Sequence, residues 1–134
     1  MDLTNRRDGL QVGGTTFAFA GVDDPHLGYD DLDAVSGPAD GTADLRIGVA
    51  HAPYLRVLDQ LARDGYELLL AGHTHGGQMW PFHYAVDMVQ PALAGLSTVG
   101  DTQLYVTRGA GFWGPPVRVG ARPEVTVVEL RSPS

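Results

Sequence analysis

The sequence predicts an α/β fold, an α+β sandwich in which a mixed β-sheet is flanked by helices. Three observations support this prediction. A hairpin pattern lies near the N-terminus, a strand–helix–strand pattern spans residues 45–71, and histidines follow both strands of that second pattern. The 134 residues match the length of one domain, and the 43% of hydrophobic residues can supply its core.

The N-terminal part of the chain reads as a β-hairpin followed by a loop. Two β-prone segments, residues 10–12 and Thr15–Val22, flank the glycine pair Gly13-Gly14. Adjacent glycines suit a tight two-residue turn because they adopt positive φ without steric cost. The acidic segment that follows is rich in glycine, and we expect only one short helix there, over residues 30–35.

The centre of the chain predicts a βαβ unit. Leu45–Ala50 and Leu68–Ala71 are apolar runs of strand length. Between them, residues 54–63 carry leucines at helical spacing, and Gly65 marks the end of that helix. A βαβ unit joins parallel strands with a right-handed crossover, so both strands end at the same edge of the sheet. Open α/β sheets bind their ligands at this edge.

Histidines leave both strands at that edge. His51 follows the first strand, and His73 and His75 follow the second. Two histidines with one spacer are by themselves a weak metal-binding signal, but a supporting strand and nearby glycines strengthen it. Imidazole nitrogens suit zinc, iron or manganese, and oxygen ligands would favour the last two. We therefore expect a metal site built on these three histidines.

The residues around the histidine pair suit such a site. Gly72, Gly76 and Gly77 are expected to be structural, because glycine permits positive φ and a close approach of the backbone to a ligand. Thr74 and Gln78 are expected to orient the imidazoles through hydrogen bonds, which metal-binding histidines commonly need.

Composition excludes several other functions. The net charge of -7 and the nine Lys and Arg residues argue against a nucleic-acid surface. The absence of cysteine excludes disulfides, zinc–thiolate sites and thiol catalysis. No run of eighteen apolar residues predicts a membrane span, and the first residues lack the apolar core of a signal peptide. The chain as given is expected to be soluble, and its compartment stays open.

The C-terminal half carries weaker signals. We expect the aromatic cluster at residues 79–84 to pack a loop onto the sheet, and we expect strands over residues 102–107 and 124–130. The glycine-rich segment 108–116 lacks the spacing and the following helix of a phosphate-binding P-loop.

Several motifs together resemble a known family. The sequence His51-Ala52-Pro53 follows a strand, and Gly-His-Thr-His-Gly-Gly-Gln occupies residues 72–78. With Gly-Val-Asp-Asp at residues 21–24 and Arg-Gly-Ala-Gly at residues 108–111, they resemble the C-terminal half of the calcineurin-like metallophosphoesterases. The subgroup they resemble comprises bacterial cell-envelope phosphoesterases and hydrolases of the UDP-diacylglucosamine type. The resemblance covers nearly the whole chain.

This resemblance implies a four-layer fold with two sheets packed between helices, and two divalent metal ions, manganese, zinc or iron. It implies hydrolysis of phosphomonoesters or phosphodiesters, with a small-molecule or lipid-linked phosphate ester as the substrate. His51 and His73 would bind one ion and His75 the other. Members of this subgroup are often attached to the membrane or exported, which implies membrane proximity of a full-length protein.

The family pattern also contains motifs that this chain lacks. They are an Asp-x-His strand end, a Gly-Asp with a bridging aspartate, and a Gly-Asn-His whose histidine is the general acid. We therefore expect residues 1–134 to be a single partial domain, the C-terminal half, with little activity of its own. The alternative is a non-catalytic module that keeps the fold for metal binding or for interaction with a partner.

Two further histidines are weaker candidates. Asp24-Pro25-His26 reads literally as Asp-x-His, but proline is unusual in the middle of that motif, so a surface turn is the better interpretation for His26. His83 lies among aromatic residues and away from a strand end, where a histidine is more often packed or exposed than bound to a metal.

Overall fold

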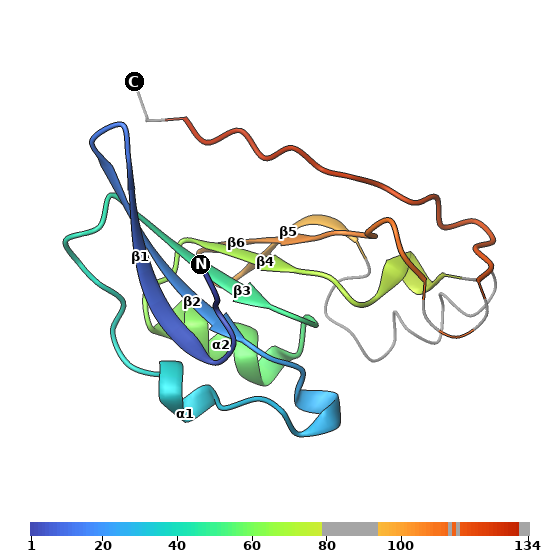
Figure 1. The fold of residues 1–134 in the computed structure, drawn as a ribbon, viewed down its shortest axis with the longest axis horizontal. Helices are drawn as coiled ribbons and strands as arrows, with labels where there is room; N and C mark the ends of the chain where they lie inside the picture. The colour runs from blue at the N-terminus through green and yellow to red at the C-terminus, as the bar shows by residue number, and fades with distance from the viewer. Residues whose placement is uncertain (79–93, 113, 115, 132–134) are drawn as a thin grey trace.

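The computed structural model of this chain describes residues 1–78, 94–112, 114 and 116–131. They form one mixed six-stranded sheet in the order β1-β2-β3-β4-β6-β5 (Figure 1). The strands are β1 (Arg6–Val12), β2 (Thr15–Val22), β3 (Leu45–Ala50), β4 (Leu68–Ala71), β5 (Gly95–Val99) and β6 (Thr102–Val106). The helices are α1 (Leu32–Val35) and α2 (Leu55–Arg63), with the short 3₁₀ turns η1 (Pro25–Leu27) and η2 (His75–Gly77). None of the described helices has the length and apolarity needed to cross a membrane.

The predicted hairpin is confirmed, and it is longer than the sequence pattern indicates. β1 pairs with β2 in antiparallel fashion from Arg6 to Val12, so its first four residues were missed. Gly13 and Gly14 have φ values of 58° and 87°, which is the geometry that the tight turn requires. Every residue of β1 is exposed, and an edge strand without buried side chains gives little hydrophobic signal.

The predicted βαβ unit is also confirmed. β3 and β4 are parallel neighbours, and α2 connects them. Tyr54 is the N-cap of α2, and Gly65 follows its C-cap with a φ of 94°. α1 is two residues shorter than expected because Asp31 accepts a hydrogen bond from the backbone N–H of Ala34 and so caps the helix there.

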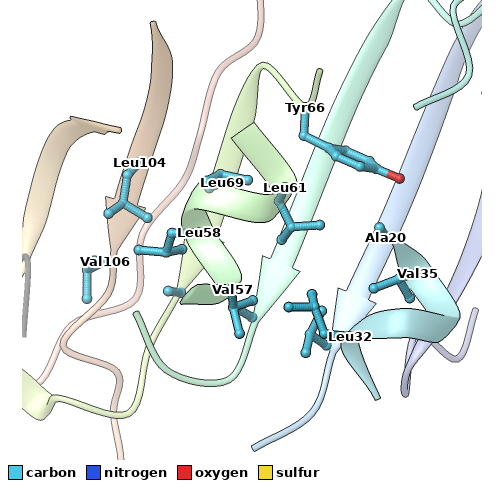
Figure 2. Packing of buried hydrophobic residues seen from close by; sticks show 13 residues of the cluster. Ala20, Leu32, Val35, Val57, Leu58, Leu61, Tyr66, Leu69, Leu104 and Val106 are labelled. Atoms are coloured by element: carbon cyan, nitrogen blue, oxygen red, sulfur yellow. The ribbon is translucent and has the colours of Figure 1, made fainter. Parts of the chain in front are cut away.

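One face of the sheet carries the core. Both α1 and α2 lie against this face, and their apolar side chains meet those of the central strands (Figure 2). Leu104 and Val106 of β6 belong to this core, as does Leu69 of β4. The fully covered members are Ala20, Val35, Val57, Leu58, Leu61 and Val106.

Gly48 lets α2 approach the sheet closely. It lies on the helix-facing side of β3, opposite Leu69 of β4. A Cβ atom built at Gly48 would stand 2.6 Å from Leu69 Cδ2 and 3.0 Å from Leu61 Cδ1. Both leucines are almost completely buried and have no free space to move into.

The opposite face of the sheet is crossed by the C-terminal segment, residues 123–131. Tyr105 alternates with the core residues of β6 and so points to this face, where its hydroxyl lies 2.7 Å from Thr126 Oγ1. Leu130 lines a cavity of about 430 Å³ with Phe17 and Leu45 of the same face. In Figure 1 this segment, coloured red, passes over the sheet on the side away from α1 and α2.

The strand predicted over residues 124–130 is wrong. The segment is extended, but no described strand lies beside it to form a ladder. Val125 and Val127, whose alternation suggested the strand, are 89% and 91% exposed. Alternation shows that a segment can have one apolar face, but a strand also needs a neighbour for its backbone hydrogen bonds. In contrast, β5 was missed, because its short mixed sequence has no such pattern.

Gly48→Ala is expected to destabilise the chain by about 1–3 kcal/mol, because the new methyl group overpacks the contact between α2 and the sheet. Urea unfolding would measure the loss. Gly41→Ala is the matched control, since nothing lies within 4 Å of its Cβ position. Equal stability of the two variants would contradict the close-packing argument.

The 134-residue chain is expected to self-associate in solution. Among the described residues, one extended segment is all that covers the sheet beyond α1 and α2, and Leu96 and Val128 are 70% and 46% exposed. Exposed apolar surface next to unpaired extended backbone promotes association. Light scattering coupled to size-exclusion chromatography would show oligomers, and a monomeric chain that melts cooperatively would refute the expectation.

Candidate metal centre

Four parallel strands end together at one edge of the sheet. The register pairs Val22 of β2 with Ala50 of β3, Ala50 with Ala71 of β4, and Ala71 with Val106 of β6. The ladder continues one step into the loops, because the N–H of His51 donates to the carbonyl of Val22 at 3.3 Å. Loops that leave these strands therefore start side by side, as the βαβ prediction requires.

The first site residues at this edge are Asp24, His51 and His73. Each offers one potential ligand atom, and the three atoms lie within 4.8 Å of one another. His51 Nε2 and His73 Nδ1 are 2.9 Å apart, and Asp24 Oδ2 lies 3.8 Å from His51 Nε2. We call these three residues the Asp–His–His group. The structure thus brings together two of the three predicted histidines and adds a carboxylate.

The three members of the Asp–His–His group differ in how far they are exposed to solvent. His51 has a half-exposed side chain, whereas Asp24 is only 7% exposed. His73 is intermediate in exposure between these two residues. Its burial lowers its pKa below the ordinary 6.5, and the neighbouring His51 lowers this pKa further. A lowered pKa keeps the imidazole of His73 neutral near pH 7, which is the form that can bind a metal.

His75 lies outside the Asp–His–His group, in η2. Its Nδ1 atom is 3.2 Å from the carbonyl oxygen of Arg108 and 2.8 Å from Nη2 of Arg118. Burial lowers the pKa of His75 as well, and the charge of Arg118 acts in the same direction. The loop after β6 therefore packs directly on this histidine.

The two contacts of His75 Nδ1 require different tautomers. A carbonyl needs Nδ1–H as a donor, whereas a guanidinium needs Nδ1 as an acceptor. Arg118 Nη2 already donates to the carbonyls of Arg108 and Gly111, so it loses little without His75. In the tautomer with the proton on Nδ1, the carbonyl of Arg108 accepts it and the Nε2 lone pair of His75 is open to a ligand.

The loop that carries the histidines is conformationally strained. His73, His75 and Gln78 have φ values of 67°, 49° and 49°, and only one other described non-glycine residue, Asn5, has a positive φ. Such geometry costs on the order of 1 kcal/mol or more per residue and clusters at functional sites. Gly76 and Gly77 share this positive φ, whereas Gly72 does not, and the structural role of all three glycines stays a prediction. Thr74 and Gln78 are 3% and 0% exposed, and their orienting role stays a prediction.

Three curated relatives carry the comparison. An uncharacterized metallophosphoesterase of Campylobacter jejuni is 42% identical over 91 residues, which are 67% of this chain and 24% of that protein. A transmembrane protein with a metallophosphoesterase domain from Bos taurus is 38% identical over 85 residues, 63% of this chain and 19% of the relative. The phosphodiesterase YaeI of Escherichia coli is 37% identical over 92 residues, 63% of this chain and 32% of the relative.

The chain belongs to the metallophosphoesterase superfamily. It spans only 19–32% of the length of these three relatives. No protein-family model and no solved structure matches it. Its mixed sheet with flanking helices is consistent with a metallophosphoesterase domain.

The donor atoms fit the divalent ions that a metallophosphoesterase uses. Two imidazole nitrogens and one carboxylate oxygen are a ligand set that zinc, iron and manganese all accept. In the metal-free chain 2.9 Å is a hydrogen-bond distance between the two rings. Two nitrogens that bind one ion at ~2.1 Å would be ~3.4 Å apart in a tetrahedral site and ~3 Å apart at the right angle of an octahedral site. The 2.9 Å between the nitrogens of His51 and His73 is close to the octahedral value.

Sequence reasoning missed Asp24. Asp24 was expected in the Gly-Val-Asp-Asp motif at residues 21–24 and in the Asp-Pro-His turn at residues 24–26, without a role as a ligand. Its position in the sequence could have indicated the site, because Asp24 comes shortly after the end of β2 and His51 comes directly after the end of β3. His26 is exposed in η1 and does not belong to the Asp–His–His group. His83 and the aromatic cluster at 79–84 lie outside the described residues.

The metal-free chain is expected to lose stability in mild acid. The pKa values of His73 and His75 are lowered in the folded state, while the unfolded chain keeps 6.5. As the pH falls from about 6.5 through these lowered values, the unfolded state binds protons first, so the free energy of unfolding decreases. Above about 6.5 both states are neutral and these two groups contribute no pH dependence.

Urea unfolding in the presence of a chelator, between about pH 5 and about pH 8, would measure this slope. The double variant His73→Asn with His75→Asn should flatten it, and asparagine also tolerates positive φ at both positions. An unchanged slope in the double variant would contradict the assignment of the acid sensitivity to these histidines.

Proposed function

We propose that this chain is the C-terminal part of a metal-dependent phosphoesterase that hydrolyses phosphomonoesters or phosphodiesters at a two-metal site. One observation carries the proposal. In this chain, which belongs to the metallophosphoesterases, histidines from two adjacent strand ends converge with a buried carboxylate at one edge of the sheet, where α/β sheets bind ligands.

His51 and His73 would hold one ion, and His75 would hold the second through its Nε2 atom. The short distance between His51 and His73 supports the first pairing, and the separate position of His75 in η2 supports the second. Bound divalent ions in such sites lower the pKa of a water molecule and polarise the phosphoryl group. The ions are manganese, zinc or iron, since each accepts imidazole and oxygen ligands.

The residues of this chain would prepare the site rather than complete it. Burial keeps His73 and His75 neutral and thus able to bind. Arg108 orients His75 by accepting its Nδ1–H, and Arg118 fixes the loop by donating to the carbonyls of Arg108 and Gly111. Such hydrogen bonds behind a metal ligand typically raise metal affinity by 10–100-fold.

The remaining ligands would come from a segment that this sequence does not contain. The Asp-x-His, Gly-Asp and Gly-Asn-His motifs of the family, including its general acid, are absent from these 134 residues. We therefore propose that residues 1–134 form one partial domain. The apolar sheet face, which no described segment but the C-terminal one crosses, is consistent with a further layer there.

The substrate would be a small-molecule or lipid-linked phosphate ester. Curated relatives from Bos taurus and Danio rerio are named transmembrane proteins with a metallophosphoesterase domain. By that likeness, the whole protein would act close to a membrane.

The deciding experiment starts from the genomic reading frame upstream of Met1. If that frame encodes the three absent motifs, the full-length protein should hydrolyse a generic aryl phosphodiester with manganese, zinc or iron. His73→Asn in this protein should lower kcat/KM by roughly 100-fold or more, because the ligand is lost while the positive φ is tolerated. His26→Asn should leave activity unchanged.

A full-length protein that is inactive with all three metals would refute the proposal. A stop codon upstream of Met1 together with a translation start site at Met1 would also refute the proposal. Either result would favour the alternative, a non-catalytic module that keeps a metal-binding loop or only the fold.

A further inference from the structure

Asp24 occupies a position in the Asp–His–His group that the family resemblance does not assign. It follows β2, whose last residue Val22 is in register with Ala50, the residue before His51. The pairing of β2, β3 and β4 that aligns the two histidines therefore also places this carboxylate beside them. It is the single carboxylate in the group of potential ligands found within the described residues.

The two oxygens of Asp24 have different surroundings. Oδ1 accepts a hydrogen bond from the backbone N–H of His26 at 2.9 Å and caps η1. Oδ2 faces the imidazole of His51, 3.8 Å from its Nε2 atom. That distance is longer than a hydrogen bond, so Oδ2 is directed toward the histidines without being bonded to them.

Capping alone does not account for this residue. An N-cap needs one oxygen, and asparagine or serine would supply it as well as aspartate does. A carboxylate that is only 7% exposed is costly to bury unless its charge is compensated. Among the ion pairs of the described residues, Asp24 Oδ2 has one partner, the imidazole of His51 at 3.8 Å, and an imidazole carries no permanent positive charge. A bound cation would supply the missing compensation.

We propose that Asp24 is an oxygen ligand of the same ion that His51 and His73 hold. The inference rests on the proposed metal site and goes beyond it, because it gives this ion three ligands from this chain alone. Two nitrogens and one carboxylate oxygen are then enough to hold one ion in the 134-residue chain, while further ligands would still come from outside it. Binding of one ion by the isolated chain is the consequence.

The variant Asp24→Asn distinguishes the proposed role of Asp24 as a metal ligand from its role as the N-cap of η1. Asparagine keeps an oxygen for the N–H of His26 but has no charge, so the fold is expected to persist. The matched control is Asp33→Asn on α1, which removes the charge of an exposed aspartate from a position outside the Asp–His–His group. Asp24→Ser is a second variant that also retains a cap, should the asparagine variant fold poorly.

The measurement is titration of the metal-free 134-residue chain with Co²⁺, followed by calorimetry and by the visible absorption of the bound ion. The unmodified chain should bind one Co²⁺, and His73→Asn should abolish binding. Asp24→Asn should weaken binding by at least roughly 10-fold and change the Co²⁺ absorption, which reports the number and type of ligands. Asp33→Asn should match the unmodified chain in both respects.

The outcomes separate the two proposals. If the unmodified chain binds and His73→Asn does not, while Asp24→Asn binds as tightly as the unmodified chain, the role of Asp24 is refuted and the histidine site stands. Weaker binding with an unchanged Co²⁺ absorption at saturation would also refute a ligand role, because Asp24 would then act through His51. No binding by the unmodified chain would overturn the role of Asp24 and the three-ligand site together, whereas hydrolysis by the full-length protein is a separate readout of the proposed function.

Discussion

The shared register of four parallel strand ends is the constraint on which this molecule depends. Backbone hydrogen bonds align Val22, Ala50, Ala71 and Val106 across the sheet, and every element of the metal centre leaves from the loops that follow. Side chains alone could not impose this alignment, since the histidine and aspartate positions are far apart in sequence. The ladder is directional and fixed by pairing, so a slip of one residue in any strand would turn its loop away from the others.

The centre also stores conformational strain that its surroundings hold in place. Positive φ at His73 and His75 is unfavourable for side chains of this size, and the loop must be secured by other contacts. The segment after β6 provides them, because Arg118 ties together the carbonyls of Arg108 and Gly111 next to His75. A rigid, preformed imidazole arrangement costs less to order when an ion binds.

The two faces of the sheet differ in the elements that cover them. α1 and α2 complete one face with a close-packed core, and Gly48 permits their approach. The other face is apolar in β2, β3 and β4, and within the part of the chain that the structure describes it is crossed only by the extended C-terminal segment, whose Val125 and Val127 are exposed. The described residues thus build a close-packed core on one face of the sheet only.

The sequence by itself determined the hairpin, the βαβ unit and the edge at which the histidines meet, because hydrophobic period, glycine turns and chain chirality are local or general constraints. Only the tertiary structure decided three further points. β1 and β5 gain their strand character from pairing, residues 124–130 form no ladder with a described strand, and Asp24, a buried residue, lies with its Oδ2 atom 3.8 Å from His51 Nε2. Pairing partners, burial and atomic distances arise between segments that are remote in the chain, and no local pattern encodes them.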